Sequence, residues 1–226
     1  MDRSDVLGEI AGRIERRHLG HPVRVAVDGR TASGKTTLAD ELAALLRERG
    51  REVIRTSIDG FHRPRAERYA RGRHSAEGYY HDARDLPAIV ALLLAPLGPE
   101  GDRHYRTTSF DLDADRPIAQ EPKIAAERAI LIVDGTFLQR PELRLHWDAT
   151  LFVRTSAETA QTRGLDRDAT RLGGEAAARD LYAQRYRPAY ALYEQIAEPE
   201  ASCDVIVDND DLACPQLHIR ATGRLA

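Results

Sequence analysis

A strand-like segment that runs directly into a glycine-rich loop and then a helix-like segment constrains this chain more than any other feature. Val23–Asp28 is apolar and β-branched, and the loop after it reads Gly29-Arg-Thr-Ala-Ser-Gly-Lys-Thr36. In this pattern, Gly-x-x-x-x-Gly-Lys-Ser/Thr, backbone N–H groups and a helix N-terminus surround phosphate oxygens. Only two of the 33 basic residues are lysines, and one of them is Lys35. The sequence therefore predicts a phosphate-binding loop between a buried strand and a helix.

The loop also supplies the candidate nucleotide-binding residues. The ammonium of Lys35 is expected at the β- and γ-phosphates of a nucleoside triphosphate, and the hydroxyl of Thr36 is expected on Mg²⁺. A glycine-rich turn that only begins a helix is the alternative interpretation. The residues expected around ATP are Gly29, Thr31, Ala32, Ser33, Gly34, Lys35, Thr36 and Thr37.

Five short β-branched runs predict the rest of the fold. They are nearly continuous apolar runs, which is typical of parallel strands buried on both faces. Helix-like patterns separate them, as in Thr37–Arg49, Asp85–Leu94 and Glu175–Ile196, where Pro188 predicts a kink or a division. We expect an α/β fold of the P-loop NTPase type in one domain, with three layers and a mostly parallel five-stranded sheet. The expected strands are Val23–Val27, Val53–Ser57, Ile130–Val133, Thr150–Val153 and Asp204–Val207.

Two aspartates follow strand-like runs and are candidates for chemistry. Asp134 ends the run Ile130–Val133, and a carboxylate at the tip of a core strand beside a phosphate loop holds Mg²⁺. Asp59 follows the second run, where a carboxylate can accept the proton of an acceptor hydroxyl. Each is followed by glycine, so a turn without chemistry is the alternative for both.

Several of these segments together resemble one family. Asp28–Thr37, Ser57–His62, a tyrosine-rich loop and Val133–Gly135 resemble the uridine kinase / phosphoribulokinase group of P-loop kinases, and the similarity covers most of the chain. The resemblance implies ATP as phosphate donor and Asp59 as catalytic base. Asp134 stands where the family has a glutamate before glycine, which keeps the charge.

Two acceptor-binding segments depart from the pattern of that family. The family's Phe-Asp-His-Pro-Asp-Ala stands here as Tyr79-Tyr80-His81-Asp82-Ala83, with a tyrosine where the first aspartate binds ribose hydroxyls. A second segment is represented only loosely, by Tyr105-Arg106 and Ser109–Asp111. The resemblance implies acceptor contacts from Tyr79, Tyr80, His81 and Tyr105. Tyr69, Tyr79 and Tyr80 can stack on a base, and the core of a small cap is an equal alternative for these three tyrosines. The departures lie in the acceptor site and leave the ATP site unchanged.

Arginines at a spacing of four residues predict a lid. Arg163, Arg167 and Arg171 would lie on one face of a helix, within a segment of about residues 157–174. Such a lid closes over the triphosphate and neutralises charge as the phosphoryl group leaves, and the family has an Arg-Asp…Arg lid of this kind. Pairing with Asp166 and Asp168 on a solvated surface is the alternative. Arg185 and Arg187 can also reach the site or lie on a helix surface.

A basic loop lies in the expected acceptor region, about residues 59–117. Residues 62–74 hold five arginines against the single acid Glu67. One hypothesis is that the acceptor carries a phosphate or a carboxylate, with His62 and Arg63 among its contacts. A solvated loop is the alternative.

The sequence thus predicts an ATP- and Mg²⁺-dependent kinase that phosphorylates a hydroxyl of a small molecule, with a nucleoside as the first expectation. Pantothenate, another riboside or a sugar phosphate are alternative acceptors, and a nucleotide-binding switch is an alternative from another class. The balance of 33 basic and 36 acidic residues argues against a nucleic-acid partner. Short apolar runs argue against a membrane span, and two cysteines without a Cys-x-x-Cys spacing favour the cytoplasm. A homo-oligomer is compatible with this sequence.

Overall fold

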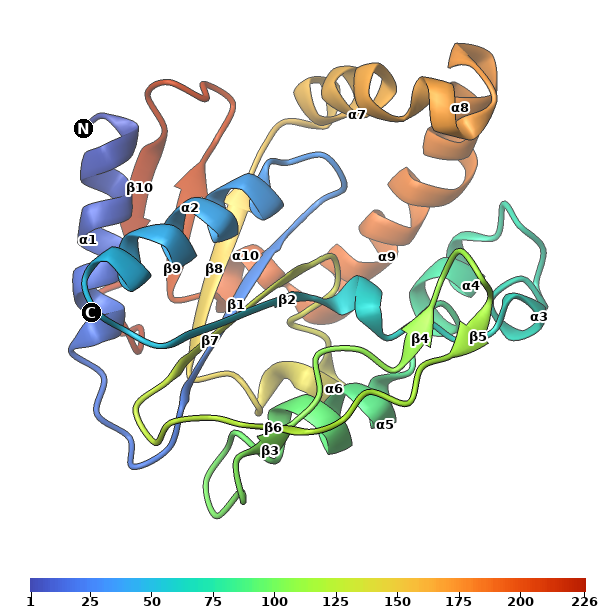
Figure 1. The fold of residues 1–226 in the computed structure, drawn as a ribbon. Coiled ribbons are helices and arrows are strands. Elements are labelled where there is room, and N and C mark those ends of the chain that lie inside the picture. The colour runs from blue at the N-terminus through green and yellow to red at the C-terminus, as the bar shows by residue number, and fades with distance from the viewer.

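A six-stranded sheet forms the centre of the molecule in a computed structural model that describes residues 1–226 (Figure 1). The strand order is β10-β9-β8-β1-β7-β2, and only β10 is antiparallel to its neighbour. The strands are β1 (Val23–Gly29), β2 (Val53–Ser57), β7 (Ile130–Gly135), β8 (Ala149–Arg154), β9 (Val205–Asp208) and β10 (Gln216–Ile219). The expected α/β fold of the P-loop type is confirmed.

The prediction of five strands is wrong by one strand. Four of the five predicted runs lie within strands of the sheet and the fifth, Asp204–Val207, begins one residue before β9, but β10 (Gln216–Ile219) was missed. This strand has four residues, it lies at the edge of the sheet, and its side chains alternate between exposed and half-buried. An edge strand therefore lacks the continuous apolar run that marks the central strands.

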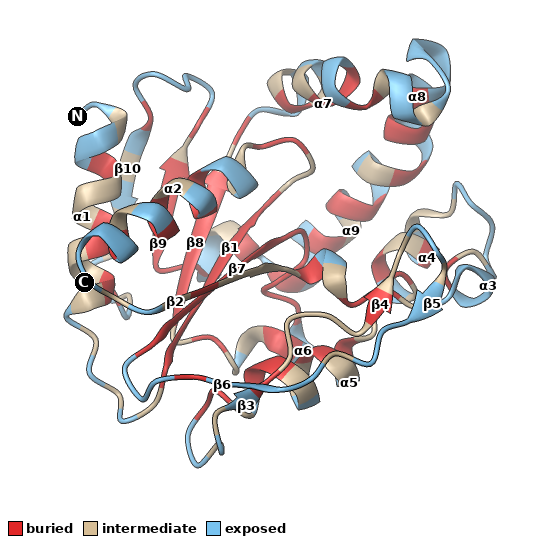
Figure 2. Ribbon diagram, in the orientation of Figure 1, coloured by how far each residue is buried: buried red, intermediate tan, exposed pale blue.

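Helices cover both faces of the sheet, so that every residue of the central strands β1 and β7 is buried (Figure 2). Ile130 and Ile132 of β7 face α1 (Arg3–Glu15) and α2 (Lys35–Glu48) in one core cluster. Leu131 and Val133 face the opposite way, into a cluster with α5 (Leu86–Ile89), the π-helical turn Val90–Leu94 and α6 (Pro141–Arg144). The strand period of two residues divides the apolar run between the two cores.

The C-terminal helical region is not one regular helix but is divided by a π-helical turn. It runs from α8 (Glu175–Leu181) through a π-helical turn (Tyr182–Tyr186) into α9 (Arg187–Ala197), and Pro188 lies in the first turn of α9. Before it, α7 (Ala157–Leu172) ends at Gly173, whose φ is 94°. In Figure 1, α7 and α8 project from the end of the sheet that carries the phosphate loop. No helix is both long enough and apolar enough to cross a membrane.

The shorter elements lie in the expected acceptor region and beside the C-terminal strands. They are a 3₁₀ turn (Ile58–Gly60), α3 (Arg65–Arg68), α4 (Ala76–His81), β3 (His104–Tyr105) paired with β6 (Lys123–Ile124), β4 (Phe110–Asp111) paired with β5 (Arg116–Pro117), and α10 (Pro199–Ser202). Figure 1 shows α3, α4, β4 and β5 gathered on one side of the sheet.

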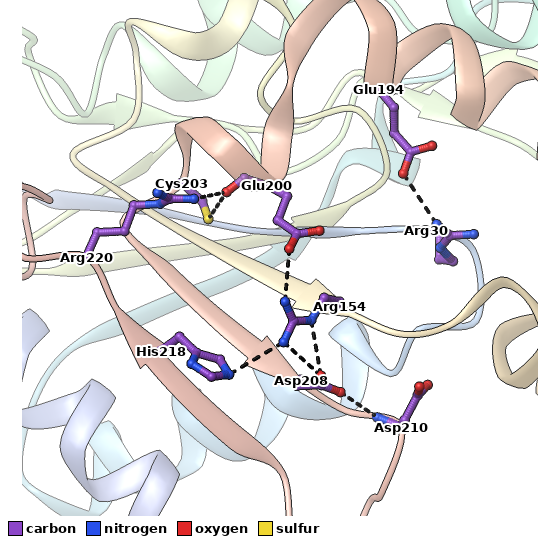
Figure 3. A network of polar contacts seen from close by, with 9 residues as sticks. All are labelled: Arg30, Arg154, Glu194, Glu200, Cys203, Asp208, Asp210, His218 and Arg220. Atoms are coloured by element: carbon purple, nitrogen blue, oxygen red, sulfur yellow. Dashed lines mark hydrogen bonds and ion pairs between the residues drawn. The ribbon is translucent and has the colours of Figure 1, made fainter.

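A polar network fastens the C-terminal strands to the rest of the sheet (Figure 3). Arg154, at the end of β8, lies 2.9 Å from the carboxylate of Asp208 and 3.0 Å from that of Glu200. In the phosphate loop, Arg30 lies 3.4 Å from Glu194 of α9. These contacts hold β9, α10 and α9 beside the loop that follows β1.

Candidate active site

A cavity of about 1080 Å³ opens where β1, β2 and β7 end. The carboxyl ends of parallel strands lie at the same edge of a sheet, which is where open α/β sheets bind ligands. The cavity wall contains Lys35 and Thr36 of the loop, Asp134 after β7 and Asp59 after β2. The four residues on which the sequence prediction depends therefore meet in one place.

The phosphate loop has the backbone geometry that its glycines require. Gly34 has φ 92°, and a Cβ there would lie 2.4 Å from the amide nitrogen of Asn209, which donates to the carbonyl of Ser33 at 2.8 Å. A Cβ on Gly29 would lie 2.6 Å from the carbonyl oxygen of Val153. The buried hydroxyl of Ser33 has no hydrogen-bond partner within the protein. The loop is thus shaped for a group that brings its own acceptors, such as a phosphate.

The buried carboxylate of Asp28 holds the start of the phosphate loop in place. This residue of β1 is fully buried and accepts hydrogen bonds from the Tyr193 hydroxyl, from Gly29 N at 2.7 Å and from the Gln139 amide at 3.3 Å. Burial raises the pKa of Asp28, and the hydrogen bonds from Tyr193 and Gly29 oppose that rise. The same desolvation lowers the pKa of Lys35, whose ammonium donates to Arg30 O at 3.1 Å.

Thr36 and Asp134 form the candidate metal site. The Thr36 hydroxyl donates to Asp134 Oδ2 at 2.5 Å, and the carboxylate is almost fully buried. No group of three or more His, Cys, Asp or Glu side chains is placed to hold a metal. Mg²⁺ needs no such group, because it binds through one or two protein oxygens together with water and substrate phosphates. The two side chains fit a Mg²⁺ ion that arrives with a triphosphate.

Arg55 is a member of this site that the sequence analysis missed. It lies on β2, with Nη1 2.7 Å from Asp134 Oδ1 and Nε 2.8 Å from Asp40 Oδ1. The signal in the sequence was an arginine within the otherwise uncharged run Val53–Ser57. Arg55 holds the Asp134 carboxylate in place beside Thr36.

Asp59 is held charged at the mouth of the cavity. Its backbone lies in the 3₁₀ turn after β2, and Arg84 Nη2 lies 2.5 Å from its Oδ1. Burial acts to raise the pKa of Asp59, but the charges of Arg84 and Lys35 hold it below the ordinary range. The carboxylate is therefore ionised at neutral pH and able to accept a proton from a hydroxyl.

His62 is neutral beside Asp59. Its ring is buried, and Nδ1 lies 2.8 Å from the backbone oxygen of Asp59. Burial lowers the pKa of His62 to about 4, helped by the nearby Arg84 and opposed by the Asp59 carboxylate. A neutral ring with its Nδ1 proton on that carbonyl fixes the turn that carries Asp59.

Only some of the predicted acceptor residues lie at the cavity. Asp59, His62 and Tyr79 line it, whereas Arg63 and His81 do not. Arg63 lies 3.9 Å from Glu67, and His81 is exposed at the end of α4. These two residues belong to the solvated surface rather than to the acceptor site.

Tyr80 and Tyr105 are core residues, which corrects the prediction that they contact the acceptor. Tyr80 is 2% exposed and packs on Phe137 with ring centroids 5.2 Å apart, and the Arg140 guanidinium lies over its ring. Tyr105 is buried in the cluster beneath α5. Neighbouring residues of a helix point about 100° apart, so α4 can present Tyr79 to the cavity only by turning Tyr80 into the core.

The lid helix brings two of its three predicted arginines to the site. Arg167 and Arg171 of α7 line the cavity, but Arg163 donates to the backbone oxygens of Asn209 and Asp210 at 2.9 and 2.8 Å. Arg163 therefore does not line the cavity, although the spacing keeps it within about 40° of Arg167 around the helix axis. It lies about 6 Å nearer the start of α7, where its guanidinium binds the segment after β9.

The two lid arginines at the cavity, Arg167 and Arg171, are also paired with an acid of their own helix, as the alternative interpretation predicts. Asp168 lies 2.8 Å from Arg167 and 3.3 Å from Arg171, and it accepts a hydrogen bond from the Tyr182 hydroxyl at 3.0 Å. Both arginines are more than half exposed, so they keep freedom to turn toward a bound anion. Of the two later arginines, Arg185 lines the cavity and Arg187 does not.

No model of a known protein family matches the chain. It is 27% identical over 159 residues to uridine-cytidine kinase B of Dictyostelium discoideum, an alignment that covers 69% of this chain and 62% of that protein. The chain thus spans less than two thirds of the length of this curated relative.

Solved structures show the same fold. A possible uridine kinase from Bacillus stearothermophilus superposes with a TM-score of 0.70 at 22% identity, over 90% of this chain and 97% of that one. D-glycerate 3-kinase from Cryptococcus neoformans superposes with a TM-score of 0.61 at 14% identity, over 95% and 98%. The fold is that of a P-loop kinase. The resemblance to the uridine kinase / phosphoribulokinase type of these kinases is confirmed.

Proposed function

We propose that this chain transfers the γ-phosphoryl group of ATP to a hydroxyl of a small molecule. The observation that carries the proposal is a shared cavity, in which the phosphate-loop residues Lys35 and Thr36 and the acid Asp134 lie together with the ionised Asp59. A nucleotide-binding protein that only hydrolyses ATP needs to position water. A kinase needs a carboxylate beside a space large enough for a second substrate, and both are present here.

Each residue has a role that follows from its position. Asp59 accepts the proton of the acceptor hydroxyl and aims its oxygen at the γ-phosphate. Lys35 holds the β- and γ-phosphates, and Arg167 and Arg171 turn from Asp168 to the transferring group. Bound Mg²⁺ would be held by Thr36 and Asp134 and would supply neutralisation of phosphate charge.

A nucleoside is the acceptor expected from the sequence. The named activity of the curated relative, a uridine-cytidine kinase, supports this expectation. The rings of Tyr69 and Tyr79 in the cavity wall also support it, because aromatic rings stack on bases. The burial of Tyr80 does not support it, since this side chain is unable to replace the family's ribose-binding aspartate. Pantothenate, another riboside and a sugar phosphate therefore stay candidate acceptors.

The test is ADP formation from Mg·ATP with each acceptor in turn, comparing the wild type with Asp59→Asn. The variant keeps the size of the side chain and removes its basicity, so we expect acceptor-dependent kcat to fall about 10²- to 10⁴-fold. Asp102→Asn, in an exposed loop outside the cavity, is the matched control and should keep full activity. ATP affinity should be retained in both variants.

The competing switch interpretation makes the opposite prediction. A nucleotide-binding switch would hydrolyse ATP slowly, no small alcohol would stimulate ADP formation, and Asp59→Asn would leave the rate unchanged. Tight binding of Mg·ATP together with these three results would refute the kinase proposal.

A further inference from the structure

Three buried arginines form the wall of the cavity beyond Asp59, and we call them the arginine wall: Arg68, Arg84 and Arg185. Each is about nine-tenths buried or more, although each carries a permanent charge. They come from α3, from the segment after α4 and from the π-helical turn before α9. Three separate parts of the chain thus bring buried cations to one surface, and the family resemblance assigned none of them.

Arg185 has no acidic partner within 4.0 Å. Its guanidinium carbon lies 4.6 Å from the centre of the Tyr79 ring and 5.2 Å from that of Tyr69. Its Nε is buried and has no hydrogen-bond acceptor. A buried cation without a counter-ion is costly, and aromatic faces compensate only in part. The position of Arg185 is explained if an anion joins it when the site is filled.

The other two arginines are only partly satisfied. Arg84 donates a hydrogen bond from Nη2 to Asp59, whereas its Nε and Nη1 are buried without acceptors. Arg68 donates a hydrogen bond from Nη2 to Asp115 at 3.0 Å, and its Nε is buried without an acceptor. Buried donors in proteins almost always have a partner. With the Nε of Arg185, four buried nitrogens around this wall lack one.

The charge of the whole cavity exceeds what a nucleotide needs. Nine cationic and four acidic side chains line it, in a chain with a formal charge of −3. Lys35, Arg167 and Arg171 are the cations assigned to the triphosphate. Mg·ATP brings roughly two negative charges, so a surplus of about three positive charges is left for the second substrate.

The arginine wall lies on the acceptor side of the catalytic carboxylate. Arg84 connects the two, because it touches Asp59 at 2.5 Å and its guanidinium lies 5.9 Å from the Tyr79 ring centre. Arg185 lies on that same ring. An acceptor whose hydroxyl meets Asp59 therefore has the rest of its body beside the arginine wall.

From this geometry we infer that the acceptor is an anionic alcohol, a small molecule that carries a phosphate or carboxylate group bound by Arg185 together with Arg84 and Arg68. The inference rests on the proposed kinase function and narrows its substrate class. Guanidinium groups pair with both anions through two parallel hydrogen bonds, so both kinds of acceptor share the recognising chemistry.

The first test measures binding and does not depend on turnover. The nucleotide site is filled with Mg²⁺ and a non-hydrolysable ATP analogue, and inorganic phosphate or acetate is then titrated by calorimetry. We expect one of the two anions to bind to the wild type and to lose about tenfold or more in affinity in Arg185→Gln. Arg187→Gln, at the first residue of α9 and outside the cavity, is the matched control and should bind normally. Failure of both anions to bind, or equal binding by Arg185→Gln, overturns the inference.

The second test measures ADP formation with ribulose 5-phosphate, D-glycerate, pantothenate, uridine and cytidine. We expect an anionic alcohol to give the highest kcat/KM, and Arg185→Gln to raise its KM about 10- to 100-fold with little change in the KM of ATP. A phosphate ester that works where the carboxylates fail identifies phosphate as the recognised group, and the reverse result identifies carboxylate. A higher kcat/KM for uridine, with a KM unaffected by Arg185→Gln, refutes the anionic acceptor but keeps the kinase. A raised KM for ATP instead of the acceptor assigns the arginine wall to the nucleotide and also refutes it.

Discussion

The neutral, buried His62 makes the stability of this protein depend on pH in a calculable way. Its pKa is lowered from 6.5 to about 4 by burial and by Arg84. In the unfolded chain the ring takes up a proton below its ordinary pKa, whereas in the folded protein it does so only below about pH 4. Between these values the unfolded state binds more protons, so stability falls as the pH falls.

The size of this loss follows from the two pKa values. Between about pH 7.5 and about pH 5.0 the contribution of His62 to the free energy of unfolding falls by about 2 kcal/mol. Urea unfolding of the wild type and of His62→Asn at both pH values measures it, because asparagine keeps a donor near the position of Nδ1. We expect the wild type to lose about 2 kcal/mol more than the variant. Parallel losses in the two proteins would refute the reasoning, and the exposed His74→Asn should behave as the wild type.

Three substitutions and one pH profile test other parts of the site. Gly34→Ala places a Cβ 2.4 Å from Asn209 at φ 92° and should lower ATP affinity tenfold or more by calorimetry. Tyr193→Phe removes a donor from the buried Asp28 and should cost about 1–3 kcal/mol in urea unfolding. Arg167→Gln should lower kcat by about 10²-fold and leave the urea midpoint nearly unchanged, since the side chain is exposed. Because the pKa of Asp59 is lowered, kcat should stay flat down to about pH 5.

The burial of Tyr80 and the arginine wall change how the family resemblance applies to this chain. The phosphate loop, the acid after β7 and the acid after β2 lie together in one cavity. The acceptor region departs from the pattern, because Tyr80 is buried in the core and three buried arginines line the cavity. The proposed function and the proposed anionic acceptor together combine the donor site of that family with an acceptor site of different charge.

The features that the sequence alone predicted are those set by local patterns. A β-branched run followed by Gly29–Thr36 and a helix specifies the phosphate loop, since glycines, lysine and threonine act at fixed positions within a few residues. Apolar, β-branched runs identified the four inner strands β1, β7, β8 and β9, because burial on both faces favours apolar residues, and the β-branched run Val53–Ser57 identified the edge strand β2. An acid at the end of such a run must lie at the ligand-binding edge, which is why Asp59 and Asp134 were found.

Only the tertiary structure decided which side chains share the cavity. Tyr79 and Tyr80 are neighbours in sequence, but the turn of α4 sends one to the cavity and the other to the core. Arg163 lies one turn before Arg167 on α7, but its guanidinium donates to the backbone after β9 instead of lining the cavity. Arg185 lies more than a hundred residues from Tyr69 and meets it only through folding. Local periodicity gives the direction of a side chain relative to its own helix. Only the packing of that helix decides which residues the side chain contacts.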